Sequence, residues 1–209
     1  MTLICFVRHG ETDWNTLRKI QGKADIPLNE IGKKQAQDCK KYFTHSQWNV
    51  LVTSPLQRAR QTAEIINENL NLNILIMDEF IERNYGDIEG LTLEQRAILY
   101  PDLTCPNQES LEQVKERTLN GLNKLHHIYS DQKIIVVAHG GVINIILSVL
   151  SNGQIGTGKT RLTNGSMSNI RFENGQWKVD NYNQVCHLKD KYIEEYVSGS
   201  SIKSCLIYE

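Results

Sequence analysis

Arg8 and His9 stand side by side directly after the apolar run at residues 3–7. Such a run is typical of a buried strand, so both side chains are expected to emerge at that strand's carboxyl end. A neutral imidazole can attack a phosphoryl group while a neighbouring guanidinium holds the phosphoryl oxygens. The pair therefore points to phosphoryl transfer.

This chemistry also needs further cations around the phosphoryl oxygens and an acid that protonates the departing alkoxide. Arg58 follows a second apolar run, and two guanidiniums beside His9 would lower its proton affinity and keep it neutral. Glu82, in a partly desolvated pocket, could protonate the leaving group and later deprotonate the attacking water. Three nearby carboxylates could serve instead: Glu11, Asp87 and Glu89.

Apolar, β-branched runs alternate along the chain with segments that carry apolar residues at helical spacing. The runs predict strands at residues 3–7, 50–53, 74–77 and 134–138. The helix-like segments are residues 31–43, 56–70 and 111–128. This alternation indicates a parallel α/β sheet, in which the side chains that follow the strands gather at one edge.

Beyond residue 150 the pattern changes to two short strand candidates, residues 167–172 and 177–182. A polar, Gly-containing turn at residues 173–176 separates them, which predicts a hairpin that closes one edge of the sheet.

Length and composition fit one globular domain over residues 1–209, with residues 198–209 a loose tail. The net charge of -1 offers no global attraction for nucleic acid or for an anionic membrane. No secretory signal opens the chain and no apolar stretch is long enough to cross a bilayer, so we expect a cytoplasmic protein. Five cysteines without a CxxC pair favour reduced thiols.

Several segments together resemble the histidine phosphatase superfamily, also called the phosphoglycerate mutase-like family. They occur in the order typical of that family and span most of the chain. They are RHGET at residues 8–12 with Asn15 downstream, Gln21-Gly22 followed by residues 25–28, SPLQRARQTA at residues 54–63, ERNYG at residues 82–86 and AHGG at residues 138–141.

The resemblance implies that His9 is the phosphorylated nucleophile, that Arg8, Arg58 and His139 surround the phosphoryl group, and that Glu82 is the proton donor. It further implies substrate contacts from Asn15, Gln21, Gly22, Arg83, Tyr85 and Gly140. No metal and no other cofactor are expected. The implied fold is a three-layer α/β/α sandwich with a mostly parallel central sheet and one antiparallel edge strand.

We predict a metal-independent phosphatase for small phosphomonoesters, whose partner is a small phosphorylated metabolite. Residues 92–110 are expected to form a cap over the pocket. The region from Glu82 to Ser110 holds only Arg83 and Arg96 as basic residues and lacks the paired arginines that resemble the mutase clamp. A cofactor-dependent phosphoglycerate mutase, an α-ribazole phosphate phosphatase and a module that binds phosphorylated ligands stay open as alternatives, and the sequence does not predict the oligomeric state.

A competing motif lies at residues 153–160, where GQIGTGKT satisfies the G-x-x-x-x-G-K-[ST] pattern of a nucleotide-binding P-loop. A P-loop must follow a buried strand and open a helix, whereas this run follows a helix-like segment. We therefore expect a Gly-rich connector.

Overall fold

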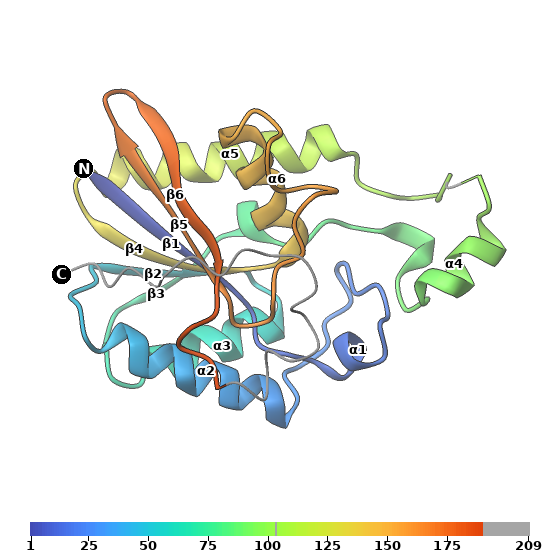
Figure 1. Cartoon of the computed structure of the whole chain (residues 1–209), viewed down its shortest axis with the longest axis horizontal. Coiled ribbons are helices and arrows are strands. Elements are labelled where there is room, and N and C mark those ends of the chain that lie inside the picture. Colours follow the sequence, from blue (N-terminus) through green and yellow to red (C-terminus); the bar gives the residue numbers. More distant parts are fainter. Residues whose placement is uncertain (103, 190–209) are drawn as a thin grey trace.

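The computed structural model describes residues 1–102 and 104–189 and shows one mixed sheet between two layers of helices (Figure 1). Its six strands lie in the order β3-β2-β4-β1-β5-β6. The predicted three-layer α/β/α sandwich is confirmed. The strands are β1 (Thr2–Arg8), β2 (Val50–Thr53), β3 (Ile74–Ile76), β4 (Lys133–Ala138), β5 (Met167–Glu173) and β6 (Gln176–Gln184).

Parallel pairing joins β1 to β4, β4 to β2 and β2 to β3. Strand β5 pairs antiparallel with β1, and β6 pairs antiparallel with β5, so the predicted hairpin closes this side of the sheet. The strand that runs against the others is β5, one place in from the edge strand β6.

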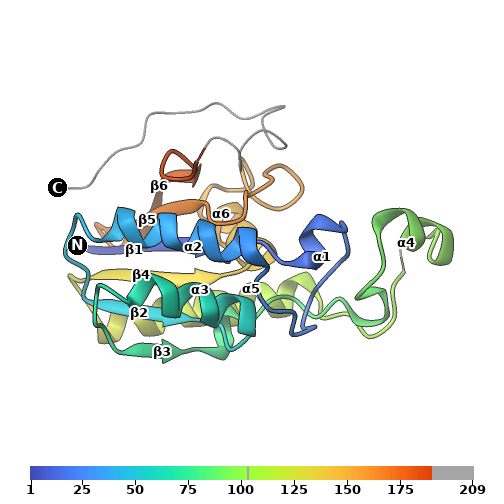
Figure 2. The ribbon, with the colours of Figure 1, turned by 90° about the horizontal axis from the view of Figure 1, so that it is seen from below.

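Helices α2 (Glu30–Phe43) and α3 (Gln57–Asn67) cover one face of the sheet, and α5 (Leu111–Ile128) and α6 (Gly140–Leu150) cover the other (Figure 2). Successive strand residues alternate between the two cores because side chains of a strand point to opposite faces. In β1, Ile4 and Phe6 pack with α5 and α6, whereas Cys5 and Val7 pack with α2 and α3.

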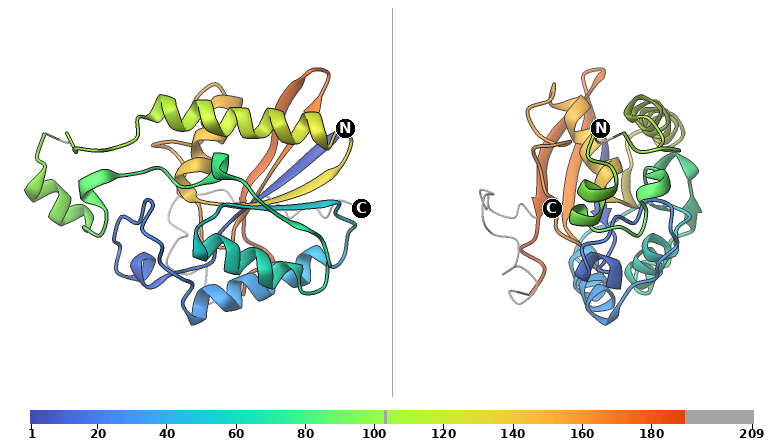
Figure 3. Two further views of the ribbon diagram at one scale, coloured as in Figure 1. Left: turned by 180° about the vertical axis from the view of Figure 1, so that it is seen from behind. Right: turned by 90° about the vertical axis from the view of Figure 1, so that its right-hand side faces the viewer.

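Helix α4 (Leu93–Leu99) lies apart from the sheet, at the end of two extended segments beyond the carboxyl ends of the parallel strands (Figure 3). It contains no buried residue. The remaining elements are short: α1 (Asp13–Thr16) and the 3₁₀ helices η1 (Asp78–Phe80) and η2 (Gly86–Ile88).

The segment at residues 153–160 follows helix α6 and consists largely of turns, so it lacks the strand–turn–helix context of a P-loop. Cys5, Cys39 and Cys105 are free thiols, but Cys186 is disulfide-bonded, which corrects the expectation of reduced thiols throughout. The tail at residues 198–209 lies outside the described residues.

Across residues 1–102 and 104–189, no helix has both the length and the apolar character that a membrane span requires.

The loop after β1 packs directly against the start of α2, and two glycines allow this approach. A Cβ on Gly10 would lie 2.4 Å from the carbonyl oxygen of Gly32, and a Cβ on Gly32 would lie 2.1 Å from that of Glu11. The backbone N–H of Glu11 donates to Gln35 Oε1 at 2.8 Å. Helix α2 therefore fixes the loop that carries His9.

Gly32→Ala should lower the free energy of unfolding by about 2–3 kcal/mol, because its new methyl group overpacks against backbone that cannot move aside. Urea unfolding followed by circular dichroism measures the change. Lys34→Ala, at an exposed position of the same helix, is the matched control and should change stability by less than about 0.5 kcal/mol. Equal stability of the two variants would contradict the proposed close packing.

Candidate active site

The carboxyl ends of β1, β2 and β4 bring together three segments that are far apart in the sequence. Arg8 is paired with Ala138 across β1 and β4, and Thr53 with Val137 across β2 and β4. The pairing continues one residue further, since His9 N–H donates to the Ala138 carbonyl and Ser54 N–H to the Val137 carbonyl, both at 3.0 Å. His9, Ser54 and His139 consequently lie side by side at this edge.

His9 is buried, with 3% of its surface exposed, and its ring is oriented by its own loop. Its Nδ1 lies 2.7 Å from the carbonyl oxygen of Gly10. A carbonyl only accepts hydrogen bonds, so Nδ1 carries the proton in the neutral ring. The lone pair is then on Nε2, which is the nitrogen available for nucleophilic attack.

The surroundings of His9 keep this lone pair free. Burial lowers the pKa of His9 well below its ordinary value of 6.5, and the positive charges of Arg58 and Arg8 lower it further. Each effect disfavours the imidazolium. His9 is therefore neutral at pH 7.

His139 lies beside His9, with ring centroids 5.1 Å apart, but it does not line the cavity. Its Nε2 lies 2.7 Å from Ser54 Oγ, and its Nδ1 has no hydrogen-bond partner among the described residues. Burial, followed by the charge of Arg58, holds the pKa of His139 well below its usual value. A neutral His139 can thus add a polar group next to His9 without adding charge.

Arg58 is the most deeply buried cation of the site, with 1% of its surface exposed. Its two terminal nitrogens donate to backbone carbonyls of the loop at residues 22–24, to Ala24 and to Gly22, both at 2.7 Å. Burial lowers the pKa of Arg58 to about 10, so the guanidinium stays charged at neutral pH. Carbonyl partners orient the guanidinium without neutralising it.

Glu89 in turn holds that loop. Its carboxylate accepts hydrogen bonds from the backbone N–H groups of Lys23, Ala24 and Tyr85, at 2.9, 3.0 and 2.9 Å. Gly22 has a φ of +53°, and a Cβ there would lie 1.9 Å from Glu89 Oε1. Glu89 therefore links the Arg58-binding loop to the segment that carries Glu82.

Of the four carboxylates that the sequence offered as acids, Glu82 is the one that lines the cavity. Its Oε1 accepts the N–H of Arg83 at 2.9 Å and its Oε2 that of Gly141 at 3.0 Å. A Cβ on Gly141 would lie 2.5 Å from Glu82 Oε1, so glycine permits the contact. The others bind elsewhere: Glu11 accepts from Asn29, Asp87 from Asn107, and Glu89 from the loop.

These side chains surround a cavity of about 390 Å³. Ten of the predicted site residues line it: Arg8, His9, Asn15, Gln21, Gly22, Arg58, Glu82, Arg83, Tyr85 and Gly140. From the predicted cap, Leu93, Arg96 and Gln108 also line it. Lys19 lines it as well, so the lining holds five lysine and arginine side chains and one carboxylate, which suits an anionic ligand. In the described part of the chain, no three His, Cys, Asp or Glu side chains converge as a metal site.

Sequence reasoning missed the polar residues that support the site from behind. The buried Asn164 donates through Nδ2 to the His9 carbonyl at 3.1 Å and to Asn15 Oδ1 at 3.3 Å. Ser54 contacts His139, and it stood within a segment already quoted for its likeness to the family. Asn164 lies in an irregular loop, and no local pattern in the sequence marked it.

Comparison with known proteins agrees with this geometry. A family model described as the histidine phosphatase superfamily (branch 1) matches residues 4–185. A protein of Bacillus subtilis named uncharacterized phosphatase PhoE is 48% identical over 188 residues, which cover 90% of this chain and 97% of that protein.

Two solved structures are also similar. Bacillus stearothermophilus YhfR has a TM-score of 0.85 and 24% identity over 90% of this chain and 100% of its own, a likeness in fold. Phosphoserine phosphatase from Entamoeba histolytica, in complex with 3-phosphoglyceric acid, has a TM-score of 0.79 and 27% identity, with the same coverage.

His9 should stay neutral well below the pH at which a free histidine becomes charged. In the free protein, we expect the ¹⁵N NMR signals of the neutral Nδ1–H tautomer of His9 to persist from pH about 8 to about 6. Loss of these signals in His9→Gln assigns them. The pKa of His9 is lowered because burial and the charges of the two arginines all oppose protonation of its ring. A titration midpoint at or above 6.5 would contradict the assignment.

Glu89→Gln should weaken the binding of inorganic phosphate about tenfold, because an amide NH₂ faces backbone donors and releases the loop that orients Arg58. Competitive inhibition by phosphate, or calorimetry, measures the change. Asp87→Asn is the matched control, since Asp87 is exposed and bonds Asn107 away from the cavity. Similar phosphate affinity in both variants would count against the role given to Glu89.

Proposed function

This chain belongs to the histidine phosphatase superfamily, and from this membership we propose that it hydrolyses small phosphomonoesters through a covalent phosphohistidine at His9. It is an enzyme, and its 48% identical relative is named a phosphatase. One observation carries the proposal: the tautomer of His9, fixed by Gly10, leaves Nε2 unprotonated in a cavity that Arg8 and Arg58 also line.

In the first step, the Nε2 lone pair attacks phosphorus and the P–O bond to the leaving group breaks. The protonated carboxyl of Glu82 gives its proton to the departing alkoxide, which leaves as the alcohol. Arg8 and Arg58 hold the phosphoryl oxygens, where charge spreads in the transition state. The products of this step are phosphohistidine and the Glu82 carboxylate.

In the second step, the Glu82 carboxylate takes a proton from water while the water oxygen attacks phosphorus. The P–N bond breaks, its electron pair returns to Nε2, and inorganic phosphate leaves. Glu82 ends protonated and His9 neutral, so the cycle closes without a metal or another cofactor.

The size and charge of the cavity support a small phosphorylated metabolite as substrate, bound in part by Asn15, Gln21, Gly22, Arg83, Tyr85 and Gly140. A lining of Leu93, Arg96 and Gln108 supports the role of residues 92–110 as a cap. The cytoplasm, where such metabolites are held, is the compartment that we propose.

Hydrolysis is favoured over the mutase alternative by the contacts of Arg83. Its Nε donates to the Glu109 carbonyl at 2.8 Å and one terminal nitrogen to Gln108 Oε1 at 3.2 Å. These bonds use part of the donor capacity of Arg83, so less of its guanidinium is left to clamp a substrate carboxylate, which a mutase must retain while it returns the phosphoryl group.

His9→Ala should reduce kcat with p-nitrophenyl phosphate at least about 10³-fold, because covalent catalysis is lost with its attacking atom. Rapid acid-free quenching with a ³²P-labelled phosphomonoester should trap an acid-labile label on the wild-type protein and none on His9→Ala. His45→Ala, at an exposed position, is the control and should retain both activity and label.

Assays of the same protein preparations with a set of phosphoglycerates distinguish a phosphatase from a mutase. Mutase turnover well above hydrolysis would overturn the phosphatase proposal, and near-wild-type activity of His9→Ala would overturn the nucleophile. Tight binding of phosphorylated ligands without any label would favour a binding module.

A further inference from the structure

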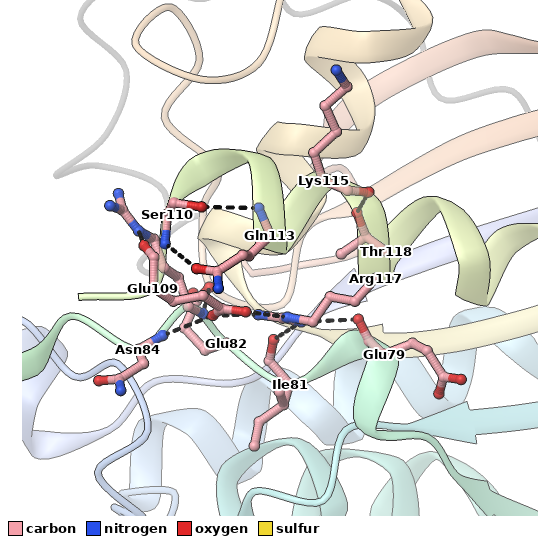
Figure 4. Close-up of polar contacts among 11 residues, drawn as sticks. Glu79, Ile81, Glu82, Asn84, Glu109, Ser110, Gln113, Lys115, Arg117 and Thr118 are labelled. Carbon is pink, nitrogen blue, oxygen red and sulfur yellow. Dashed lines mark hydrogen bonds and ion pairs between the residues drawn. The ribbon is translucent and has the colours of Figure 1, made fainter. Parts of the chain in front are cut away.

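Arg117, on the second turn of α5, uses its guanidinium to bind the chain just before Glu82. One terminal nitrogen donates to the backbone carbonyls of Glu79 at 2.9 Å and Ile81 at 2.6 Å (Figure 4). The same guanidinium makes two parallel bonds to the Glu109 carboxylate, through Nε at 2.7 Å and the other terminal nitrogen at 3.0 Å. Four hydrogen bonds occupy four of its five N–H groups.

Glu109 binds the chain just after Glu82. Its Oε2 accepts the N–H of Asn84 at 3.2 Å, and its own N–H donates to the Asn84 carbonyl at 2.9 Å. Its carbonyl accepts from Arg83 Nε at 2.8 Å. Glu109 is held in turn because the next residue, Ser110, caps α5 through a reciprocal bond with Gln113 (Figure 4).

The pair is largely shielded from water, with side-chain exposures of 20% for Arg117 and 15% for Glu109. Burial alone would raise the pKa of Glu109, but hydrogen bonds from Arg117 and Asn84 outweigh it and hold the pKa below its usual value. A partly buried, bidentate pair of this kind has a defined geometry, unlike an exposed ion pair.

Glu82 therefore sits at the centre of a segment that is fixed on one side by Arg117 of α5 and on the other by Glu109, which directly precedes the N-cap of that helix. Among the described residues, its own carboxylate accepts hydrogen bonds from the N–H groups of Arg83 and Gly141, and Arg83 belongs to the same fixed segment. We propose that Glu109 and Arg117 are positioning residues that aim the Glu82 carboxyl at the leaving-group oxygen. This inference rests on the proposed function, in which Glu82 is the acid.

Substrates with different leaving groups distinguish a positioning role from a purely structural one. An alkyl phosphate needs a proton from the acid as its P–O bond breaks, whereas p-nitrophenolate is a stable anion and leaves without one. The parameter to compare is kcat/KM, because it reports phosphorylation of His9 and excludes the later hydrolysis.

In Arg117→Met, kcat/KM for an alkyl phosphate such as glycerol phosphate should fall about 30-fold or more, out of the 10²–10⁴-fold that an acid contributes. The fall for p-nitrophenyl phosphate should be less than about threefold. Glu109→Gln should show the same selectivity with a smaller loss, and serves if Arg117→Met does not fold. Thermal melting of each variant establishes that folded protein is compared.

Lys124→Met is the matched control, because Lys124 lies on the same helix and pairs with the side chain of Glu79 without touching the backbone beside Glu82. It should match the wild type with both substrates. Folded Arg117→Met and Glu109→Gln that lose both activities equally, or lose neither, would overturn the positioning role.

Failure of the inference and failure of the proposed function give different results. Glu82→Gln should show the leaving-group selectivity in full, and His9→Ala should lose both substrates. If these two behave so while the Arg117 and Glu109 variants show no selectivity, the positioning role alone is wrong. If Glu82→Gln shows no selectivity, the acid itself is misassigned.

Discussion

A neutral imidazole between positive charges is the constraint on which this site depends. His9 must keep a lone pair on Nε2, and burial together with Arg58 and Arg8 holds its pKa low enough for this. In the proposed mechanism, the same arginines must remain available to the phosphoryl oxygens, so they cannot be neutralised by carboxylates. Backbone carbonyls at Gly22 and Ala24 solve this problem for Arg58, because they accept hydrogen bonds but carry no net charge. The guanidinium is thereby oriented, and its positive charge next to the cavity is not neutralised.

Two further carboxylates contact the backbone of the loops that surround the cavity. Glu89 binds backbone N–H groups of the loop that orients Arg58, and Glu109 binds the segment that carries Glu82. Both are close enough to fix the geometry, and neither lines the cavity. Glu82 is the one carboxylate in the described lining, so a bound phosphate would meet a single carboxyl group there. This arrangement keeps negative charge away from the dianion and leaves one acid for the leaving group.

The sequence predicted the features that depend on local pattern. Apolar, β-branched runs marked β1 to β4, a polar turn between two short strand candidates marked the β5–β6 hairpin, and α5 spans the predicted residues 111–128. Boundaries set by side-chain contacts were predicted less accurately. Helix α3 ends at Asn67, three residues before the predicted end at residue 70. The Asn67 side chain donates to the carbonyl of Leu72 and accepts from its N–H, which turns the chain there. The roles of Glu89 and Asn164 depend on partners tens of residues away, and no spacing within one segment can indicate them. Glu89 was accordingly grouped with the candidate acids.

In the proposed function, the residues of phosphoryl transfer and those of substrate recognition lie on different parts of the fold. His9, Arg58 and His139 follow strands or open helices of the packed sandwich, where pairing between β1, β2 and β4 fixes their separation. Helix α4 buries no residue, yet its Leu93 and Arg96 face the same cavity. Substitutions on α4 therefore disturb few packing contacts, whereas a shift of the strand ends would alter the charge around His9. A fold built this way can change the substrate that it accepts while the phosphoryl-transfer chemistry stays constant.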